Sequence, residues 1–234
     1  MCLGLAWIAL PRWLHQLECR AGTDWGARGL NRIDGLIRLF CRRYHRLRAD
    51  TVPLPSHGGA IVVANHVSGL DPLLLIASSR RPLRFIIARE QYQRLGLHWL
   101  FRWGGCIPVD RAARPERALR DALRALRSGE VVALFPHGGI HLDHEPHRKL
   151  KGGVAALARL TGCPVVPLRI EGVRGQGFVV AALWLRSRAR LRAFPLLQCE
   201  AGEEHAFLHR LAGQIEGHWQ RQHRGRPPQG THAS

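Results

Sequence analysis

The chain has 234 residues, enough for one globular domain whose core needs no disulfides. Apolar residues make up 46% of it, which excludes a largely disordered chain. Its 35 basic residues outnumber 17 acidic ones, and the net charge of +18 favours a phosphate-bearing partner: nucleic acid, an anionic lipid headgroup or a phosphorylated substrate. Only Lys149 and Lys151 are lysines, an arginine excess that a genomic composition bias would also produce.

The cysteines and the first residues bear on the compartment. Six cysteines are scattered without a CxxC pair, so we expect free core thiols and a reducing compartment. No apolar run reaches the ~18 residues of a membrane-spanning helix. Residues 1–10 are apolar but stop at Pro11 and Arg12, without a basic region ahead of them or a clear cleavage site, so we expect no signal peptide.

Residues 1–50 carry an apolar stripe flanked by arginines. The stripe, at helical spacing, consists of Leu30, Ile33, Leu36, Ile37, Phe40, Tyr44 and Leu47, and its flanks of Arg32, Arg38, Arg42, Arg43, Arg46 and Arg48. Such a basic amphipathic helix can lie in a bilayer interface, or it can pack on the domain with its arginines in water. Both interpretations stay open, and we predict that residues 1–50 form a membrane-docking segment.

From about residue 58 short apolar runs alternate with helical periodicity. We expect strands at 60–64, 83–88, 106–109, 131–135 and 164–170, and helices at 72–77, from 89 through about 101, at 115–127 and at 153–160. This alternation predicts an α/β fold: a mixed, mostly parallel sheet flanked by helices, with an N-terminal amphipathic helical segment.

The C-terminal part predicts an edge of that sheet and a final helix. Strand-like runs at residues 177–185 and 191–197 are expected to pair at an edge, and a helix is expected over 203–220. Residues 221–234 are rich in Gly, Pro and His, which predicts a disordered tail. The main domain is therefore predicted over residues 51–220.

A histidine and an aspartate stand five residues apart where the first strand ends, in the segment 65–72 (NHVSGLDP). On a straight helix five residues turn through about 500°, which separates the two side chains, but on a loop eased by Gly69 they can meet. Asp71 would then hold one imidazole nitrogen of His66 while the other accepts a proton from a hydroxyl. Alternatively Asp71 is an N-cap with Pro72 at the first helical position, and both roles can coexist.

Three further segments follow in order: 105–111 (GCIPVDR), 134–139 (LFPHGG) and 165–168 (VVPL). Together with the His-x4-Asp segment, their order and spacing resemble the four sequence blocks of the glycerolipid acyltransferases, which include the bacterial lysophosphatidate (1-acylglycerol-3-phosphate) acyltransferases. The resemblance runs from about residue 53 to residue 172. The ordered set is specific, although each block alone is weak.

The resemblance implies a role for each block. His66 would be the general base, Asp71 would orient it, and Arg111 would lie near the phosphate of the acceptor. The fourth block would shape the acyl-binding region. The acyl donor would be a thioester on coenzyme A or acyl carrier protein, and no cofactor, metal or covalent enzyme intermediate is implied. The residues expected to hold the acceptor are Phe135, Pro136, His137, Gly138 and Lys151.

We therefore predict an O-acyltransferase of phospholipid biosynthesis, with an acyltransferase domain over residues 51–220. Its expected acceptor is a lysophospholipid, first of all 1-acylglycerol-3-phosphate. Direct transfer between two bound substrates relies on their placement and on one proton transfer. We expect the protein at the cytoplasmic face of a membrane, peripheral or monotopic, on an anionic lipid surface.

The third block departs from the family pattern Phe-Pro-Glu-Gly-Thr-Arg. His137 replaces the glutamate, Gly139 the threonine and Ile140 the arginine. An acidic acceptor contact and a phosphate-binding arginine are therefore missing, although Arg148, Lys149 and Lys151 lie downstream. Another lipid alcohol or amine is thus an alternative acceptor.

The same loop carries a cluster of potential metal ligands. They are His137, His141, Asp143, His144, Glu145 and His147. Clusters of this kind can bind zinc or another transition metal, but they also occur in polar loops, and no cysteine joins this one. We interpret it as a polar active-site loop and predict no metal site.

Two other functions compete with acyl transfer. The charge fits a nucleic-acid-binding protein, but the basic residues spread over the whole chain and no binding motif appears, so we expect no nucleic-acid partner. A lipid-binding protein that has lost catalysis would fit the altered third block, but the intact His66 and Asp71 oppose it.

Overall fold

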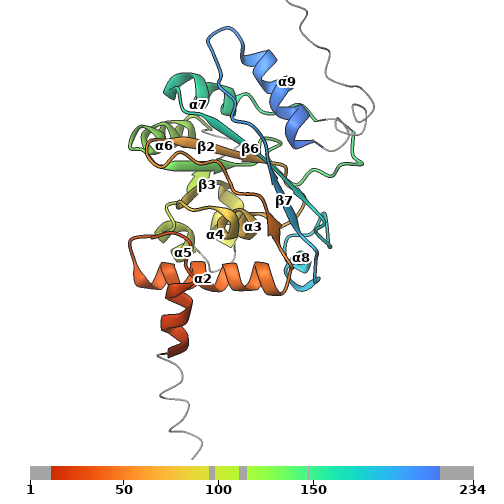
Figure 1. Cartoon of the computed structure of the whole chain (residues 1–234). Coiled ribbons are helices and arrows are strands. Elements are labelled where there is room, and N and C mark those ends of the chain that lie inside the picture. Colours follow the sequence, from red (N-terminus) through yellow and green to blue (C-terminus); the bar gives the residue numbers. More distant parts are fainter. Residues whose placement is uncertain (1–11, 95–97, 111–114, 147, 217–234) are drawn as a thin grey trace, which may run out of the picture.

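The computed structural model describes residues 12–94, 98–110, 115–146 and 148–216 (Figure 1). Seven strands in this part form one sheet in the order β1-β7-β6-β2-β5-β3-β4. They are β1 (Arg48–Ala49), β2 (Ala60–Ala64), β3 (Leu83–Ala88), β4 (Ile107–Val109), β5 (Val131–Leu134), β6 (Val165–Glu171) and β7 (Arg190–Ala193). Neighbours run parallel except β6 and β7, so the predicted mixed, mostly parallel sheet is confirmed.

The sheet separates two hydrophobic cores. Every residue of the central strand β2 is buried, because Ala60, Val62 and Ala64 pack into one core and Ile61 and Val63 into the other. A strand buried on both faces is a continuous apolar run in the sequence. The bounds predicted for this strand, 60–64, therefore agree with those of β2.

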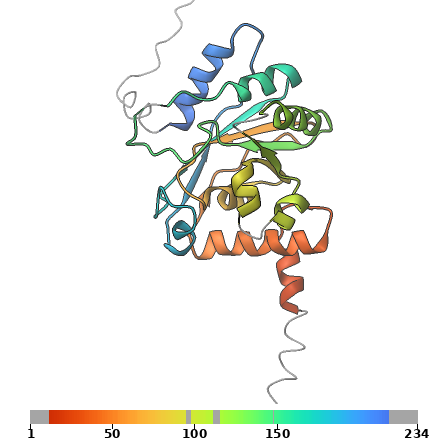
Figure 2. The ribbon, with the colours of Figure 1, turned by 180° about the vertical axis from the view of Figure 1, so that it is seen from behind.

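Helices cover both faces of the sheet (Figures 1 and 2). One layer holds α2 (Arg28–Arg43), α3 (Asp71–Ser78), α4 (Arg89–Arg94), α5 (His98–Trp103) and α8 (Ala181–Trp184). The other holds α6 (Pro115–Arg127), α7 (Gly153–Thr161) and α9 (Glu204–Ile215). None of the described helices is long and apolar enough to cross a bilayer.

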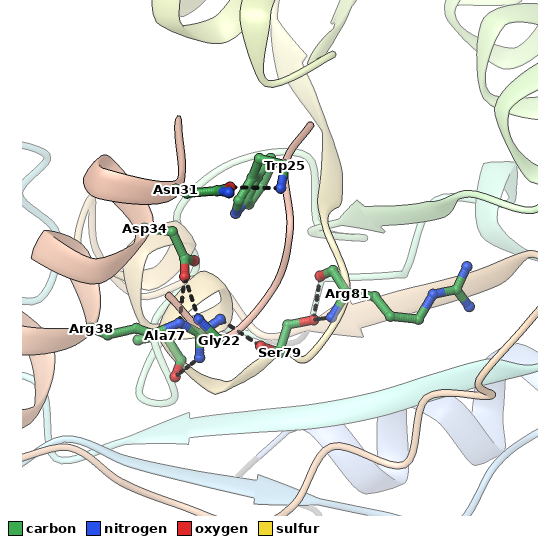
Figure 3. A network of polar contacts seen from close by, with 8 residues as sticks. All are labelled: Gly22, Trp25, Asn31, Asp34, Arg38, Ala77, Ser79 and Arg81. Atoms are coloured by element: carbon green, nitrogen blue, oxygen red, sulfur yellow. Dashed lines mark hydrogen bonds and ion pairs between the residues drawn. The ribbon is translucent and has the colours of Figure 1, made fainter. Parts of the chain in front are cut away.

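A buried ion pair fastens α2 to the end of α3 (Figure 3). Arg38 Nε donates to Asp34 Oδ2 at 2.6 Å, and Gly22 N donates to the same oxygen at 2.8 Å. The guanidinium also donates to the carbonyls of Ala77 and Ser79, at 2.9 and 2.6 Å. These lie at the C-terminal end of α3, where backbone carbonyls have no donor within the helix. Arg38 therefore does not lie in water, as one of the two sequence interpretations had it, because Asp34 one turn earlier supplies the compensating charge.

Residues 28–49 of the N-terminal segment are packed on the rest of the domain. A short helix over residues 12–19 meets α2 at Gly35, where a Cβ would lie 1.9 Å from the carbonyl oxygen of Leu17. Cys41 of α2 is buried in the first core, and β1 extends the sheet through β7. The domain boundary at residue 50 stays a prediction.

Several predicted elements differ from the structure. Residues 177–185 are not an edge strand but a loop followed by α8, because this backbone bonds to the loop after β2 instead of to a strand. The run 191–197 yields β7 and one isolated bridge between Leu197 and Val165. The helix expected from 89 to 101 is two helices, and the last helix ends at Ile215. The predicted tail, 221–234, lies outside the described residues.

Candidate active site

His66 and Asp71 meet at the carboxyl edge of the sheet. β2 ends at Ala64, and the loop that follows turns back so that His66 Nδ1 lies 2.8 Å from Asp71 Oδ2. Asp71 is the first residue of α3, while the N-cap is Leu70 and lacks a side-chain capping bond. The interpretation of Asp71 as an N-cap is therefore wrong: its carboxylate reaches back to the loop rather than to the helix.

The Asp71 carboxylate is fully buried and holds this loop together. Its Oδ2 accepts from the amides of Val67 and Ser68, at 2.6 and 2.8 Å, and its Oδ1 accepts from Ser68 Oγ at 2.9 Å. A carboxylate can only accept, so the His66 nitrogen facing it donates its N–H, and Nε2 is left as the acceptor. Sequence reasoning missed Ser68, whose place three residues before an aspartate is its only signal.

Asn65 fixes the start of the loop, and sequence reasoning missed it as well. Its buried side chain donates to the carbonyl of Ile170 at 3.0 Å and accepts from the Ile170 amide at 2.7 Å. The amide thus replaces backbone pairing where β2 stops beside β6. Asparagine directly after a buried strand was the available signal.

The third block gathers around His66. The ring of Phe135, just after β5, stacks on the His66 imidazole with centroids 4.1 Å apart and planes 15° apart. Lys151 N donates to the Pro136 carbonyl at 2.9 Å. The Lys151 side chain crosses Gly138, where a Cβ would lie 2.6 Å from Nζ and where φ is +75°, so glycine suits the position.

A cavity of about 710 Å³ lies beside His66 and reaches between α2, α3, β3 and α5. Phe135, Gly138 and Ile140 also border it. Its volume lies within the usual range of small-molecule sites. Most of its wall is apolar, including Ile37, Leu73, Ile76, Phe85, Phe101 and Val180. A hydrocarbon chain would find matching surface there, with the histidine at hand.

Comparison with known proteins identifies the family. A family model described as acyltransferase matches residues 46–171. The chain belongs to the acyltransferase family. The structure shares its fold with the crystal structure of the 1-acyl-sn-glycerophosphate (LPA) acyltransferase PlsC from Thermotoga maritima, with a TM-score of 0.65 and 19% identity over 95% of this chain and 98% of that one.

Two curated relatives are similar over part of their length. N-acylphosphatidylethanolamine synthase of Arabidopsis thaliana is 31% identical over 46% of this chain and 41% of its own. The probable 1-acyl-sn-glycerol-3-phosphate acyltransferase of Mycoplasma pneumoniae is 33% identical over 49% of this chain and 45% of its own. The chain thus spans less than half the length of these two relatives.

His137, which stands at the acyltransferase glutamate position, lies apart from the cavity. Its side chain is buried, and Nε2 lies 3.1 Å from Oε1 of Glu216, at the end of α9. The lining of the cavity includes Gly138, Gly139 and Ile140 but not His137. Of the predicted acceptor residues, Phe135 and Gly138 therefore line the cavity, whereas His137, like Pro136 and Lys151, does not.

His141 links the same loop to the loop after β2. Its amide donates to the His66 carbonyl at 2.8 Å, and its Nδ1 lies 2.8 Å from Glu145 Oε2. Burial lowers the pKa of His141, and the charges of His137 and Arg148 add to this against the opposing Glu145. The lowered pKa favours the neutral imidazole, and the ring joins this loop to Glu145.

The structure bears differently on the remaining predicted groups. Arg111 and His147 lie outside the described residues. Within the described part of the chain no group of three or more His, Cys, Asp or Glu side chains is arranged to hold a metal ion. Burial raises the pKa of the Cys106 thiol beside the cavity to about 11, so it stays protonated at neutral pH.

Proposed function

We propose that this acyltransferase moves a fatty acyl group from a thioester, on coenzyme A or acyl carrier protein, to the hydroxyl of a lysophospholipid at the cytoplasmic face of a membrane. The first-choice acceptor is 1-acylglycerol-3-phosphate, which would place the reaction in phospholipid biosynthesis. One observation carries the proposal: a histidine held by a buried carboxylate at 2.8 Å borders an apolar cavity of about 710 Å³. The name of the Mycoplasma pneumoniae relative supports the choice of acceptor.

The residues suggest a direct transfer. Nε2 of His66 takes the proton of the acceptor hydroxyl while that oxygen attacks the thioester carbonyl carbon. Collapse of the tetrahedral adduct breaks the carbon–sulfur bond, and the departing thiolate takes the proton back from the imidazolium. Asp71 stabilises the imidazolium in between, and the stacked ring of Phe135 fixes its plane.

Lys151 is our candidate for the acceptor's phosphate. It is exposed, and its ammonium lies over Gly138, which borders the cavity. The family arginine of the third block is replaced by Ile140, which lines the cavity with apolar surface. A lysine contacts phosphate as a point charge, without the two-pronged geometry of arginine, so we expect weaker phosphate recognition than the family pattern provides.

An amine acceptor is the second candidate. The altered third block removes anionic and cationic contacts at once, and one relative is named N-acylphosphatidylethanolamine synthase. An ethanolamine phospholipid would offer a nucleophilic nitrogen to the same base. This candidate differs from the first only in the acceptor.

A panel of acceptors tests the proposal. Labelled acyl-CoA and acyl carrier protein thioester would each be offered with lysophosphatidate, a monoacylglycerol and phosphatidylethanolamine. We expect the highest kcat/KM with lysophosphatidate; a higher value with phosphatidylethanolamine would establish the second candidate. Absence of transfer to all three, together with tight, salt-sensitive binding of DNA or RNA, would favour a nucleic-acid-binding protein instead.

A further inference from the structure

The segment from residue 178 to residue 185 exposes a run of large apolar side chains, which we call the α8 patch. Trp184 is 75% exposed and Phe178 62%, and Val179, Val180 and Leu185 are exposed as well. Most exposed apolar residues of a soluble protein stand singly. Five within eight positions indicate a surface that has a partner.

The surroundings of the α8 patch are basic. Between residues 172 and 199 the sequence has five arginines and no acidic residue, and Arg186 and Arg188 beside the patch are exposed. α8 lies next to the C-terminal end of α2, where Arg42 and Arg43 are exposed (Figure 1). Tyr44 Oη donates to the Trp184 carbonyl at 2.6 Å and joins the two elements. The partner is therefore apolar at its centre and anionic around it.

The backbone of the α8 patch is joined to the catalytic loop. Gly177 N donates to the Val67 carbonyl at 2.9 Å, and Gly69 N donates to the Phe178 carbonyl at 3.1 Å. The approach is so close that a Cβ on Gly69 would lie 2.0 Å from the Val179 carbonyl oxygen. Val179 and Val180 also line the cavity beside His66. One segment thus forms both the exposed apolar surface and a wall of the cavity.

We propose that the α8 patch inserts into the surface of an anionic bilayer, so that the cavity wall at Val179 and Val180 faces lipid and acyl chains reach His66 from the membrane. This inference rests on the proposed function for the identity of the chains, but not for the membrane contact itself. Tryptophan and phenylalanine beside arginines are typical of elements that lie in a membrane interface. An acidic carrier protein would be matched by the arginines but would not explain the exposed Trp184 and Phe178.

Vesicle binding by the full chain tests the proposal. The variant Phe178→Ser/Trp184→Ser changes two side chains that do not line the cavity, and Leu160→Ser is the control, because Leu160 is 43% exposed on α7, across the sheet. Sedimentation with phosphatidylcholine vesicles, with and without phosphatidylglycerol, gives the affinities. We expect the double variant to bind the anionic vesicles at least about tenfold more weakly, and the control to bind as the wild type does.

Two further measurements test whether Trp184 itself enters the bilayer and whether the double variant keeps an intact site. Trp184→Phe should keep vesicle binding but lose part of the tryptophan quenching by brominated lipids, and the double variant should keep its kcat/KM on short-chain, water-soluble substrates. Wild-type vesicle affinity in the double variant would overturn the proposal. So would a double variant that binds acyl carrier protein more weakly but binds vesicles as the wild type does. Because binding is measured without turnover, a protein that transfers no acyl group can still confirm or refute the membrane contact.

Discussion

At the scale of single residues, the site depends on one buried carboxylate with four donors around it. Asp71 receives the imidazole N–H, two amides and a hydroxyl, and these fix which ring nitrogen of His66 is left as a proton acceptor. Asp71→Asn would put a donor among these donors and favour the wrong tautomer. We expect the rate constant of single-turnover acyl transfer to fall by about 10² to 10⁴, within the range for losing a positioned base.

Ser68→Ala is a milder variant for comparison with Asp71→Asn. It removes only the hydroxyl bond to Asp71 Oδ1 and leaves both amides in place. Its rate should fall by no more than about tenfold, the equivalent of one ordinary hydrogen bond. An Asp71→Asn enzyme as active as Ser68→Ala would show that the carboxylate does not set the tautomer.

A second residue-scale prediction concerns pH and His45. This histidine is fully buried and lies edge-on to the stacked rings of Phe40 and Tyr44, and burial lowers its pKa. The unfolded chain then takes up this proton near the ordinary value of about 6.5, while the folded chain takes it up only at lower pH. Stability is therefore present above about pH 6.5 and is lost as the pH falls below it.

Thermal unfolding between pH 7.5 and pH 5 measures this loss. His45→Phe keeps an aromatic ring at this position but removes the group that titrates, so we expect a smaller drop in Tm over this range than in the wild type. If Tm falls equally with pH in the variant and in the wild type, other groups account for the pH dependence. One of them is His141, whose pKa is also lowered.

At the scale of elements, the attachment of α2 to α3 depends on the buried pair Asp34–Arg38. Asp34→Ala leaves the guanidinium buried without its counter-charge, which typically costs about 3–5 kcal/mol of unfolding free energy. Replacing both residues, in Asp34→Leu/Arg38→Met, removes the two charges together and should cost less. Denaturant unfolding measures both variants, and a larger loss in the double variant than in Asp34→Ala would assign the stabilisation to the carbonyl contacts of Arg38 instead.

The contact between the loop after β2 and residues 177–180 is the other feature at this scale. These residues follow β6 and come back to bond with Val67 and Gly69, more than a hundred positions earlier. Alternation of apolar residues carries no information about such a partner, which is why the sequence predicted a strand here. The same apolar run is exposed in the structure, and this exposure is what makes it a candidate membrane contact.

At the scale of the whole molecule, the parts that could be predicted are those that depend on local pattern. The buried parallel strands are continuous apolar runs, and the helices that cover them show helical periodicity, so sheet and helices followed from the sequence. His66 and Asp71 followed from a turn-forming spacing together with the family resemblance. Asn65 and Arg38 did not, because their partners, Ile170 and the carbonyl end of α3, are brought close only by the fold.

The cavity combines residues from distant segments, so we expect acceptor choice to depend on the whole fold. Ile140 lines the cavity and His137 does not, so the two family replacements should behave differently. Ile140→Arg should shift the ratio of kcat/KM values toward lysophosphatidate over a monoacylglycerol. His137→Glu would bring a carboxylate against Glu216 in a buried place and should lower Tm without that shift. A ratio unchanged in a folded Ile140→Arg protein would show that this loop does not choose the acceptor.

If His66 is the general base for acyl transfer, His66→Ala removes the group that accepts the proton of the acceptor hydroxyl. The measurement is single-turnover transfer of a labelled acyl group from its thioester to the best acceptor of the panel, with thermal unfolding recorded on the same sample. We expect the rate of His66→Ala to be lower by about 10² to 10⁴ and its unfolding profile to be close to that of the wild type. Wild-type turnover in the folded variant would contradict this expectation and place the base elsewhere.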